Sequence, residues 1–430
     1  MRRRRWGSAI AGAAVVAAGL VACGDPGPSG GDEAAAGGGA AATAPITFQV
    51  KAEPEEAAVY RSLVTAYQGS GGGDVEMIPV GRKDHLTRLS TAFASGDAPD
   101  VFLINYREYA PFVQRGAVEP IGPMLTENGM NRSDYYEEPL KAFTYEGDLQ
   151  CMPQNISSLV VYWNTKLFAA AGVEAPKPGW TWDQFASAAA SLTKGAVKGV
   201  GIDPSITRMA PLIWSRGGTV VDDTAKPTRT TLHEPGARAA LQEVVDLIAS
   251  GSTPSKEQMA AQGLEEQFMT GKIAMFMSSR VEVPALREQK GLEFDVAGLP
   301  SLGQPASVLH SDAYCIAAGS PNKEAAAKFI AYAVGQQGQT VTALGGRTVP
   351  SLRSVATSPA FLSPDRAPAS SQVFLDAIPH LQHTPVTPVW PEVEDIMGTQ
   401  LQRAFEDRVP LDEVISEIRS QADPLLAKGS

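Results

Sequence analysis

The stretch between residues 46 and 104 alternates strand and helix signals, and this order constrains the fold more than any other feature. Apolar spacing predicts strands at 46–50 and 75–80, with helices at 54–68 and about 86–95. Val101–Ile104 is a continuous apolar run, which is typical of a strand buried on both faces. A β-α-β-α-β order implies a mostly parallel sheet flanked by helices, so we assign the chain to the α/β class.

The rest of the chain continues in the same style. We predict strands at 159–163 and 273–277, and helices at about 181–192, 236–250, 320–335, 392–407 and 411–426. Thr181 and Gln184 form a capping-box pattern, and Pro321 is expected at the first position of its helix. A chain of 430 residues exceeds the roughly 250–300 residues at which one core stops growing, so we expect two domains.

The N-terminus has the pattern of a secretory signal. Arg2–Arg5 form a basic region, and residues 6–22 carry no charge. The run ends Leu-Val-Ala-Cys23, which resembles the lipobox of bacterial lipoproteins. That resemblance implies a signal peptide over 1–22 and lipidation of Cys23; the alternative is an ordinary signal peptide followed by an incidental cysteine. The arginines leave the export route, general or twin-arginine, open.

Residues 23–45 read as a flexible tether. After Cys23 they are rich in Gly, Ala and Pro and contain no aromatic residue, so they cannot form a core. A lipid anchor followed by a tether predicts a body that works at the outer face of the cytoplasmic membrane.

Composition and motifs argue against several classes of function. The formal net charge of −11 does not suit a nucleic-acid partner. The sequence holds no GxGxxG, GxxxxGK[ST] or HExxH string, so we predict no cofactor, no metal and no catalytic residue. His380 and His383 are the only pair spaced for a metal, and without a third ligand they read as solvated loop histidines. The chain is therefore not expected to be an enzyme.

Two cysteines remain after Cys23. Thiols outside the cytoplasm tend to pair, so Cys151 and Cys315 are a disulfide candidate, with two separate buried thiols as the alternative.

Five strings occur in order along the body. They are Ala94-Ser-Gly-Asp-Ala-Pro-Asp-Val101; Cys151-Met-Pro-Gln with Val161-Tyr-Trp-Asn-Thr-Lys-Leu-Phe168; Gly179-Trp-Thr-Trp-Asp-Gln-Phe185; Phe268-Met-Thr-Gly-Lys-Ile-Ala-Met275; and Ser320-Pro-Asn-Lys323 through Phe329. Together they resemble the family 1 extracellular solute-binding proteins of ABC importers, the group that includes maltose-binding protein.

The resemblance implies a two-lobed periplasmic-binding-protein-like fold of type II. Each lobe would be a mostly parallel sheet flanked by helices, and hinge strands would join the lobes. The first lobe would comprise 46–152 plus 316–367, and the second 156–312 plus 370–430. Cys151 and Cys315 would fall on hinge strands that lie side by side in relatives, which favours the disulfide.

The function implied by the resemblance is capture of a sugar or oligosaccharide between the lobes and delivery to the membrane subunits of an ABC permease. We expect a monomer whose binding step involves no covalent chemistry. Ser278-Ser279-Arg280 stands where the family often has Gly, which puts the ligand type in doubt. The alternatives are a different solute (a polyol phosphate, peptide or polyamine), an anchored carbohydrate-active hydrolase, and a structural lipoprotein.

Candidate ligand contacts are of two kinds. Aromatic rings suit the C–H faces of sugars, and the resemblance places Trp390 and Trp214 at the cleft. Polar side chains near strand ends suit hydroxyl groups, because α/β sheets bind ligands at that edge. These polar candidates are Glu53, Arg82, Asn105, Tyr106, Asn155, Ser157, Arg280 and Asp312. Each of these polar residues could instead be a solvated rim residue or a helix cap, and Trp390 could instead be part of the packing. Arginines beside Glu53 and Asp312 would also tolerate an acidic sugar.

Overall fold

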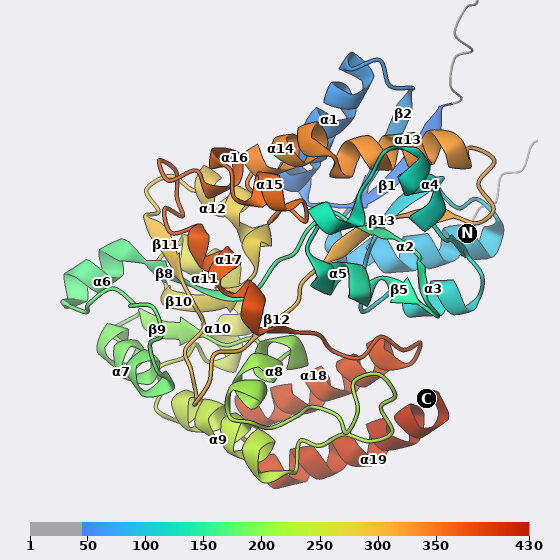
Figure 1. Cartoon of the computed structure of the whole chain (residues 1–430). Coiled ribbons are helices and arrows are strands. Elements are labelled where there is room, and N and C mark those ends of the chain that lie inside the picture. Colours follow the sequence, from blue (N-terminus) through green and yellow to red (C-terminus); the bar gives the residue numbers. More distant parts are fainter. Residues whose placement is uncertain (1–44, 430) are drawn as a thin grey trace, which may run out of the picture. The chain divides into compact units, whose positions relative to one another are not determined.

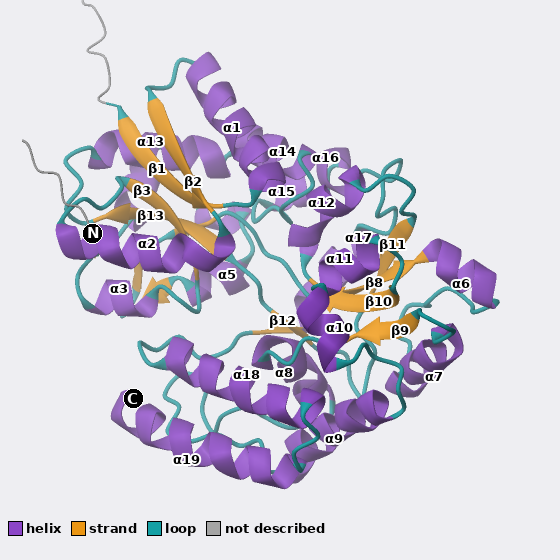
Figure 2. Ribbon diagram, turned by 180° about the vertical axis from the view of Figure 1, so that it is seen from behind, coloured by secondary structure: helices purple, strands orange, loops and turns teal. Residues whose placement is uncertain are grey.

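The computed structural model describes residues 45–429 (Figure 1). Two main sheets, each flanked by helices, define what we call the first lobe and the second lobe (Figure 2). The predicted signal peptide, the lipidation site at Cys23 and residues 24–44 of the predicted tether lie outside the described residues. Within 45–429, no helix combines the length and apolarity that crossing a bilayer requires.

The sheet of the first lobe has the strand order β2-β1-β3-β13-β4, with β7 also pairing with β13. Its strands are β1 (Ile46–Lys51), β2 (Val75–Val80), β3 (Val101–Asn105), β4 (Val118–Glu119), β7 (Met152–Pro153) and β13 (Asp312–Ala317). β1 is parallel to β2 and β3, as predicted. β13 runs antiparallel to β3, β4 and β7, so the sheet as a whole is mixed.

The first lobe holds the three helices that apolar spacing predicts, at 54–68, about 86–95 and 320–335, and further helices that it does not predict. They are α1 (Pro54–Gly69), α2 (Arg82–Ser95), α3 (Ala110–Gln114), α4 (Gly122–Glu127), η1 (Arg132–Asp134), α5 (Glu137–Ala142), α13 (Lys323–Val334) and α14 (Gln336–Leu344), with a small hairpin of β5 (Thr144–Tyr145) and β6 (Asp148–Leu149). α13 begins after Pro321, two residues later than predicted. The Ser320 hydroxyl accepts the Asn322 N–H at 3.0 Å and donates to Asp100, which holds this segment in a turn.

The sheet of the second lobe has the order β11-β8-β10-β9. Its strands are β8 (Val160–Asn164), β9 (Lys198–Gly201), β10 (Ile273–Ser278) and β11 (Phe294–Ala297). Only β9 and β10 are parallel, so this sheet is mixed too. The helices are α6 (Thr165–Ala171), α7 (Trp182–Leu192), α8 (Ile206–Ser215), α9 (Pro235–Ala249), α10 (Lys256–Ala261), α11 (Leu264–Met269), η2 (Arg280–Glu282), α12 (Val283–Glu288), α18 (Trp390–Glu406) and α19 (Leu411–Gly429).

The predicted cap of α7 is confirmed. Thr181 and Gln184 exchange the two hydrogen bonds of a capping box, and the Trp180 and Phe185 rings meet edge to face at 5.4 Å. These contacts fix the direction in which the chain enters the helix.

Three segments run side by side where the chain passes between the lobes. Ser157 and His310 exchange both backbone hydrogen bonds at 2.8 Å, and the Ile156 N–H donates to the Val349 carbonyl at 2.9 Å. The remaining elements are β12 (Ser307–Val308), α15 (Arg353–Ala356), α16 (Pro359–Leu362), α17 (Gln372–Asp376), η3 (Ile378–His380) and β14 (Leu381–Gln382). Of these, β12 pairs with β14, and α15 and α16 pack against α14 of the first lobe. Because β13 carries residues 312–315 into the first sheet, this passage precedes residue 312 rather than lying between 312 and 316.

Cys151 and Cys315 form a disulfide with a Cα–Cα distance of 4.5 Å, and both residues are fully buried. The predicted pairing is thus confirmed. Cys315 lies inside β13, opposite Phe102 of β3. The disulfide therefore ties the start of the first crossing segment to the sheet of the first lobe.

Candidate functional site

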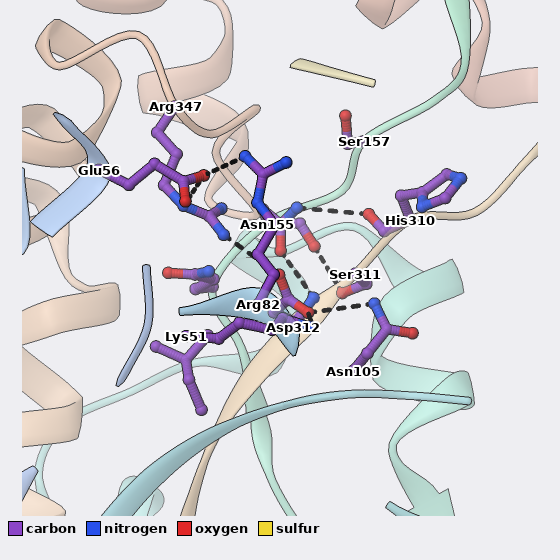
Figure 3. A network of polar contacts seen from close by, with 12 residues as sticks. Lys51, Glu56, Arg82, Asn105, Asn155, Ser157, His310, Ser311, Asp312 and Arg347 are labelled. Carbon is purple, nitrogen blue, oxygen red and sulfur yellow. Dashed lines mark hydrogen bonds and ion pairs between the residues drawn. The ribbon is translucent and has the colours of Figure 1, made fainter. Parts of the chain in front are cut away.

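A cavity of about 200 Å³ lies where the two lobes meet, at the carboxyl ends of the parallel strands of the first sheet (Figure 3). Lys51 ends β1, Arg82 follows β2 and Asn105 ends β3, so these three side chains reach one edge. A larger cavity of about 440 Å³ has its whole lining in the second lobe, so closure of the lobes would not sense its occupant.

Asp312 is the charged centre of the first-lobe wall. Its carboxylate accepts a hydrogen bond from the Asn105 amide at 3.0 Å and lies 3.5 Å from the Lys51 ammonium. The Arg347 guanidinium lies 3.6 Å away. Burial alone would raise the pKa of Asp312, but Lys51 and Arg347 outweigh burial and hold the pKa well below its usual range. Asp312 is therefore a carboxylate at neutral pH.

A second carboxylate, Glu56, lies outside the cavity lining and orients two arginines by direct contact. It accepts a hydrogen bond from Arg82 at 3.1 Å and lies 3.2 Å from Arg347. Glu53 caps α1 in a capping box with Glu56 and accepts the backbone N–H of Arg82 at 3.0 Å. The placement of Glu53 matches the helix-cap alternative, since its carboxylate orients the start of α2 and is not part of the cavity lining.

The opposite wall comes from the crossing segments and from α8. The side-chain Oδ1 of Asn155 accepts the Asp312 backbone N–H at 2.8 Å, and the side-chain Nδ2 of Asn155 donates to the His310 carbonyl at 3.3 Å. Ser157 lies beside it. Arg208 of α8 reaches the His310 imidazole, with Nη1 3.4 Å from Nε2. Burial lowers the pKa of His310 well below its usual value, and Arg208 lowers it further, so the imidazole is neutral and Nε2 can accept from Arg208.

Four predicted ligand contacts are buried away from the cavity. Tyr106 is fully buried, and its hydroxyl pairs with Thr384 at 3.1 Å. Trp214 of α8 and Trp390, the first residue of α18, are buried in the core of the second lobe. Arg280 lies over the Phe361 ring at 4.8 Å and donates to the Gly346 carbonyl at 2.9 Å. The placement of Trp390 fits the packing alternative, whereas the burial of Tyr106 and Arg280 shows that neither is a solvated rim residue.

The structure thus brings together five of the predicted residues: Arg82, Asn105, Asn155, Ser157 and Asp312. Sequence reasoning missed Lys51, Arg107, Arg208, His310 and Arg347, which line the same cavity. The rule that ligands bind at strand ends could have found Lys51, which is the last residue of the first strand. Arg208 and Arg347 carry no such signal, because α8 and the loop after α14 reach the cavity only through tertiary folding.

The cavity chemistry is polar and charged. Among the described residues, no Phe, Tyr or Trp lines it, whereas five lining side chains are Lys or Arg. Nor does the described part of the chain hold a group of three or more His, Cys, Asp or Glu residues suited to a metal ion. The lining offers hydrogen-bond donors and acceptors for a small polar solute.

A family model described as bacterial extracellular solute-binding protein matches residues 62–369. The chain belongs to this family. The diacetylchitobiose binding protein DasA of Streptomyces coelicolor is 23% identical over 339 residues, which cover 76% of each chain.

Solved structures show the same fold. The ABC substrate-binding protein Lmo0181 of Listeria monocytogenes, in complex with cycloalternan, superposes with a TM-score of 0.82 at 21% identity, over 88% of this chain and 98% of that one. UgpB of Mycobacterium tuberculosis, in complex with glycerophosphocholine, gives a TM-score of 0.77 at 20% identity, over 90% of this chain and 99% of that one. The family and the two-lobed fold implied by the motifs are confirmed.

Proposed function

We propose that this protein is the substrate-binding component of an ABC importer and captures a sugar or another polyhydroxylated solute between its lobes. The observation that carries this proposal is the cavity itself, whose polar lining comes from both lobes. The family of extracellular solute-binding proteins and the sugar complexes among its structural neighbours support it. We place the ligand against Arg82, Asn105, Asn155, Ser157 and Asp312.

Capture would work by closure of the lobes. A ligand that touches both walls gains its full set of contacts only when the lobes are closed, so binding shifts the population toward the closed state. Arg107, which follows β3, forms an ion pair with Glu394 of α18. This pair spans the lobes beside the cavity and would form only on closure. A permease could then distinguish loaded from empty protein by the closed geometry.

The proposal includes a lipid anchor at Cys23, membrane subunits of a permease as partners, and a monomer at the outer face of the cytoplasmic membrane. The lipobox-like end of the signal sequence supports the anchor. The hydrolase alternative has less support, because the family that the chain belongs to consists of binding proteins. The main alternative is a different solute, and the charged lining of the cavity supports that alternative.

Thermal unfolding against a solute panel tests the function. The panel contains mono-, di- and oligosaccharides, polyol phosphates, peptides and polyamines, and the protein is the full chain in mild detergent. A ligand at about 100 times its Kd adds roughly 2.7 kcal/mol. An unfolding entropy of about 2.1 cal/mol/K per residue over residues 45–429 makes that a rise of about 3 °C in Tm.

Two controls sharpen the experiment. Asn155→Ala is expected to lose the ligand-induced rise, whereas Asn128→Ala, at the end of α4 and away from the cavity, is expected to keep it. Chromatography of the solute after incubation separates binding from hydrolysis, since a receptor returns its ligand intact. A Tm that stays unchanged across the whole panel would contradict the proposed function.

A further inference from the structure

The cavity surface carries an excess of positive charge. Lys51, Arg82, Arg107, Arg208 and Arg347 line it, against two carboxylates, Asp312 and Glu282. The carboxylates Glu56, Glu108 and Glu394, which pair with the cations of the first lobe, are not part of the lining. An occupant therefore meets mainly guanidinium and ammonium groups.

Arg208 differs from the other four cations. Its Nη1 meets only the neutral His310 imidazole at 3.4 Å, and its Nε is buried without a hydrogen-bond partner. Across residues 45–429, no carboxylate lies within 4 Å of its guanidinium, whereas each of the other four has at least one. A half-buried arginine whose Nε has no partner favours an anionic acceptor, because guanidinium groups bind carboxylates and phosphates with paired hydrogen bonds.

Cations of both lobes line the same cavity. Arg208 belongs to α8 of the second lobe, whereas Lys51 is the last residue of β1 and Arg107 follows β3 in the first. Burial lowers the pKa of His310 well below its usual value, and Arg208, Arg107 and Lys51 lower it further while Asp312 opposes them. The positive charge on the cavity surface therefore comes from both lobes.

The volume of the cavity and the residue types that line it limit the class of solute that fits. A volume of about 200 Å³ equals that of roughly six or seven water molecules, so it suits a solute of one sugar ring or a short polyol. Of the described residues, none places an aromatic ring in the lining, so stacking against a neutral sugar face is missing here.

Building on the proposed function, we propose that the solute is a small sugar or polyol that carries an anionic group, a phosphate or a carboxylate, held between Arg208 of the second lobe and Lys51 and Arg107 of the first. Asp312, Asn105 and Asn155 then meet the hydroxyl groups. Arg208 determines specificity for charge, since it is the lining cation without a carboxylate partner.

The test compares matched neutral and anionic probes on the full chain in mild detergent. The probes are glycerol against glycerol 3-phosphate, and D-glucose against D-glucose 6-phosphate and D-glucuronate. Thermal shift identifies a binder, and isothermal titration measures its affinity. We expect at least one anionic probe to raise Tm and its neutral parent to leave Tm unchanged. The comparison of phosphate with uronate identifies which anion the site takes.

Variants then assign the charge recognition to Arg208. We expect Arg208→Gln to weaken the anionic probe by roughly 10- to 100-fold, since it removes a charge-assisted hydrogen bond, and Arg208→Lys to restore part of the affinity. Arg216→Gln makes the same charge change at an exposed position at the end of α8 and is expected to leave affinity unchanged. The Tm of each variant without ligand shows whether it is folded.

The outcomes separate this inference from the proposed function. If neutral probes raise Tm and anionic probes do not, the inference is wrong while the receptor function stands. If no anionic probe binds but a peptide or polyamine does, the inference and the carbohydrate class both fail. Equal loss of affinity in Arg208→Gln and Arg216→Gln would also overturn it, because a general change in charge would then explain the effect.

Discussion

Removal of the disulfide between Cys151 and Cys315 gives a prediction whose magnitude follows from the structure. The bond joins the residue just before β7 to the middle of β13, and neither sulfur is accessible to solvent. It ties the first crossing segment to the first-lobe sheet without spanning the two lobes. The replacement Cys151→Ala with Cys315→Ala should therefore lower stability while leaving the cavity lining in place.

The expected loss follows from the closed loop. The bonded residues are 164 positions apart. In the chain-entropy description, a loop of that length makes the unfolded state less favourable by about 5 kcal/mol, and native disulfides typically contribute 2–5 kcal/mol. An unfolding entropy of about 0.8 kcal/mol/K for residues 45–429 converts this range into a fall in Tm of about 3–6 °C.

The assay is thermal unfolding with and without a thiol-free reductant, after equilibration in mild denaturant to expose the bond. Reductant should lower the Tm of the wild-type chain by the stated amount and leave the double alanine variant unchanged. The number of free thiols in the denatured wild-type chain should rise by two. The reasoning is refuted if reductant shifts both proteins equally, or if the wild-type Tm does not move although the two thiols are released.

Three further predictions concern charge, closure and packing. Burial and Glu282 raise the pKa of Glu265 to about 8, so the folded chain keeps a proton that the unfolded chain releases above 4.5. Stability therefore falls as pH rises from 4.5 to 8. Glu265→Gln should remove roughly 2–3 °C of that decline in Tm, a figure that allows for solvent screening of this partly exposed group. Parallel plots of Tm against pH for the wild-type chain and the variant would contradict this prediction. Glu394→Gln breaks the ion pair with Arg107 and should weaken any ligand of the panel by roughly 5- to 100-fold and raise the radius of gyration in solution scattering; an unchanged radius and affinity would count against closure through this pair. Trp390→Ala leaves a cavity at a fully buried position, so Tm should fall by about 4–6 °C while ligand affinity is retained. If Trp390 contacted the ligand instead, the variant would lose affinity at constant Tm.

Local sequence patterns predict the elements of this fold because each depends on neighbouring residues. The apolar stripe of α1, the capping box of α7 and the buried run of β3 all formed where their spacing indicated. These local patterns do not predict the direction of β13. This strand returns from the other lobe and pairs with β3, whose residues lie about 200 positions earlier in the sequence. A mixed sheet in the first lobe is the consequence, and in the second lobe the sheet is mixed because β8 runs antiparallel to β10 and β11.

A site residue was predicted correctly where strand order fixes its position and incorrectly where tertiary packing sets its side-chain direction. Residues at strand ends, such as Asn105 at the end of β3 and Asp312 at the start of β13, are placed by the sheet, so sequence order locates them. Trp390 lies between residues that suggest a loop, yet α18 begins at the tryptophan itself and buries its ring. Arg280 lies close to the predicted end of its strand, but its guanidinium packs in the interior against the rings of Phe361 and Phe374. Side-chain direction depends on neighbours that the local pattern does not contain.

The distribution of charge across the lobes suggests how a ligand would control closure. In the empty protein, closing brings Arg208 of the second lobe toward Lys51 of the first, whereas Arg107 gains the Glu394 carboxylate as its partner. As an order of magnitude, two like charges about 8 Å apart repel by about 2 kcal/mol at an effective dielectric constant of about 20, which would disfavour a closed state by about 30-fold at most, because the Glu108 and Asp312 carboxylates beside Lys51 reduce the repulsion. An anion between them replaces repulsion with attraction on both sides, so its binding energy differs between the open and closed states, and that difference is what shifts the population. A neutral solute of the same size would leave the repulsion in place. Arg208→Gln should consequently close more readily when empty, seen as a smaller radius of gyration without ligand, while it binds the anion less tightly; a radius equal to that of the wild-type chain would show that repulsion does not hold the lobes apart.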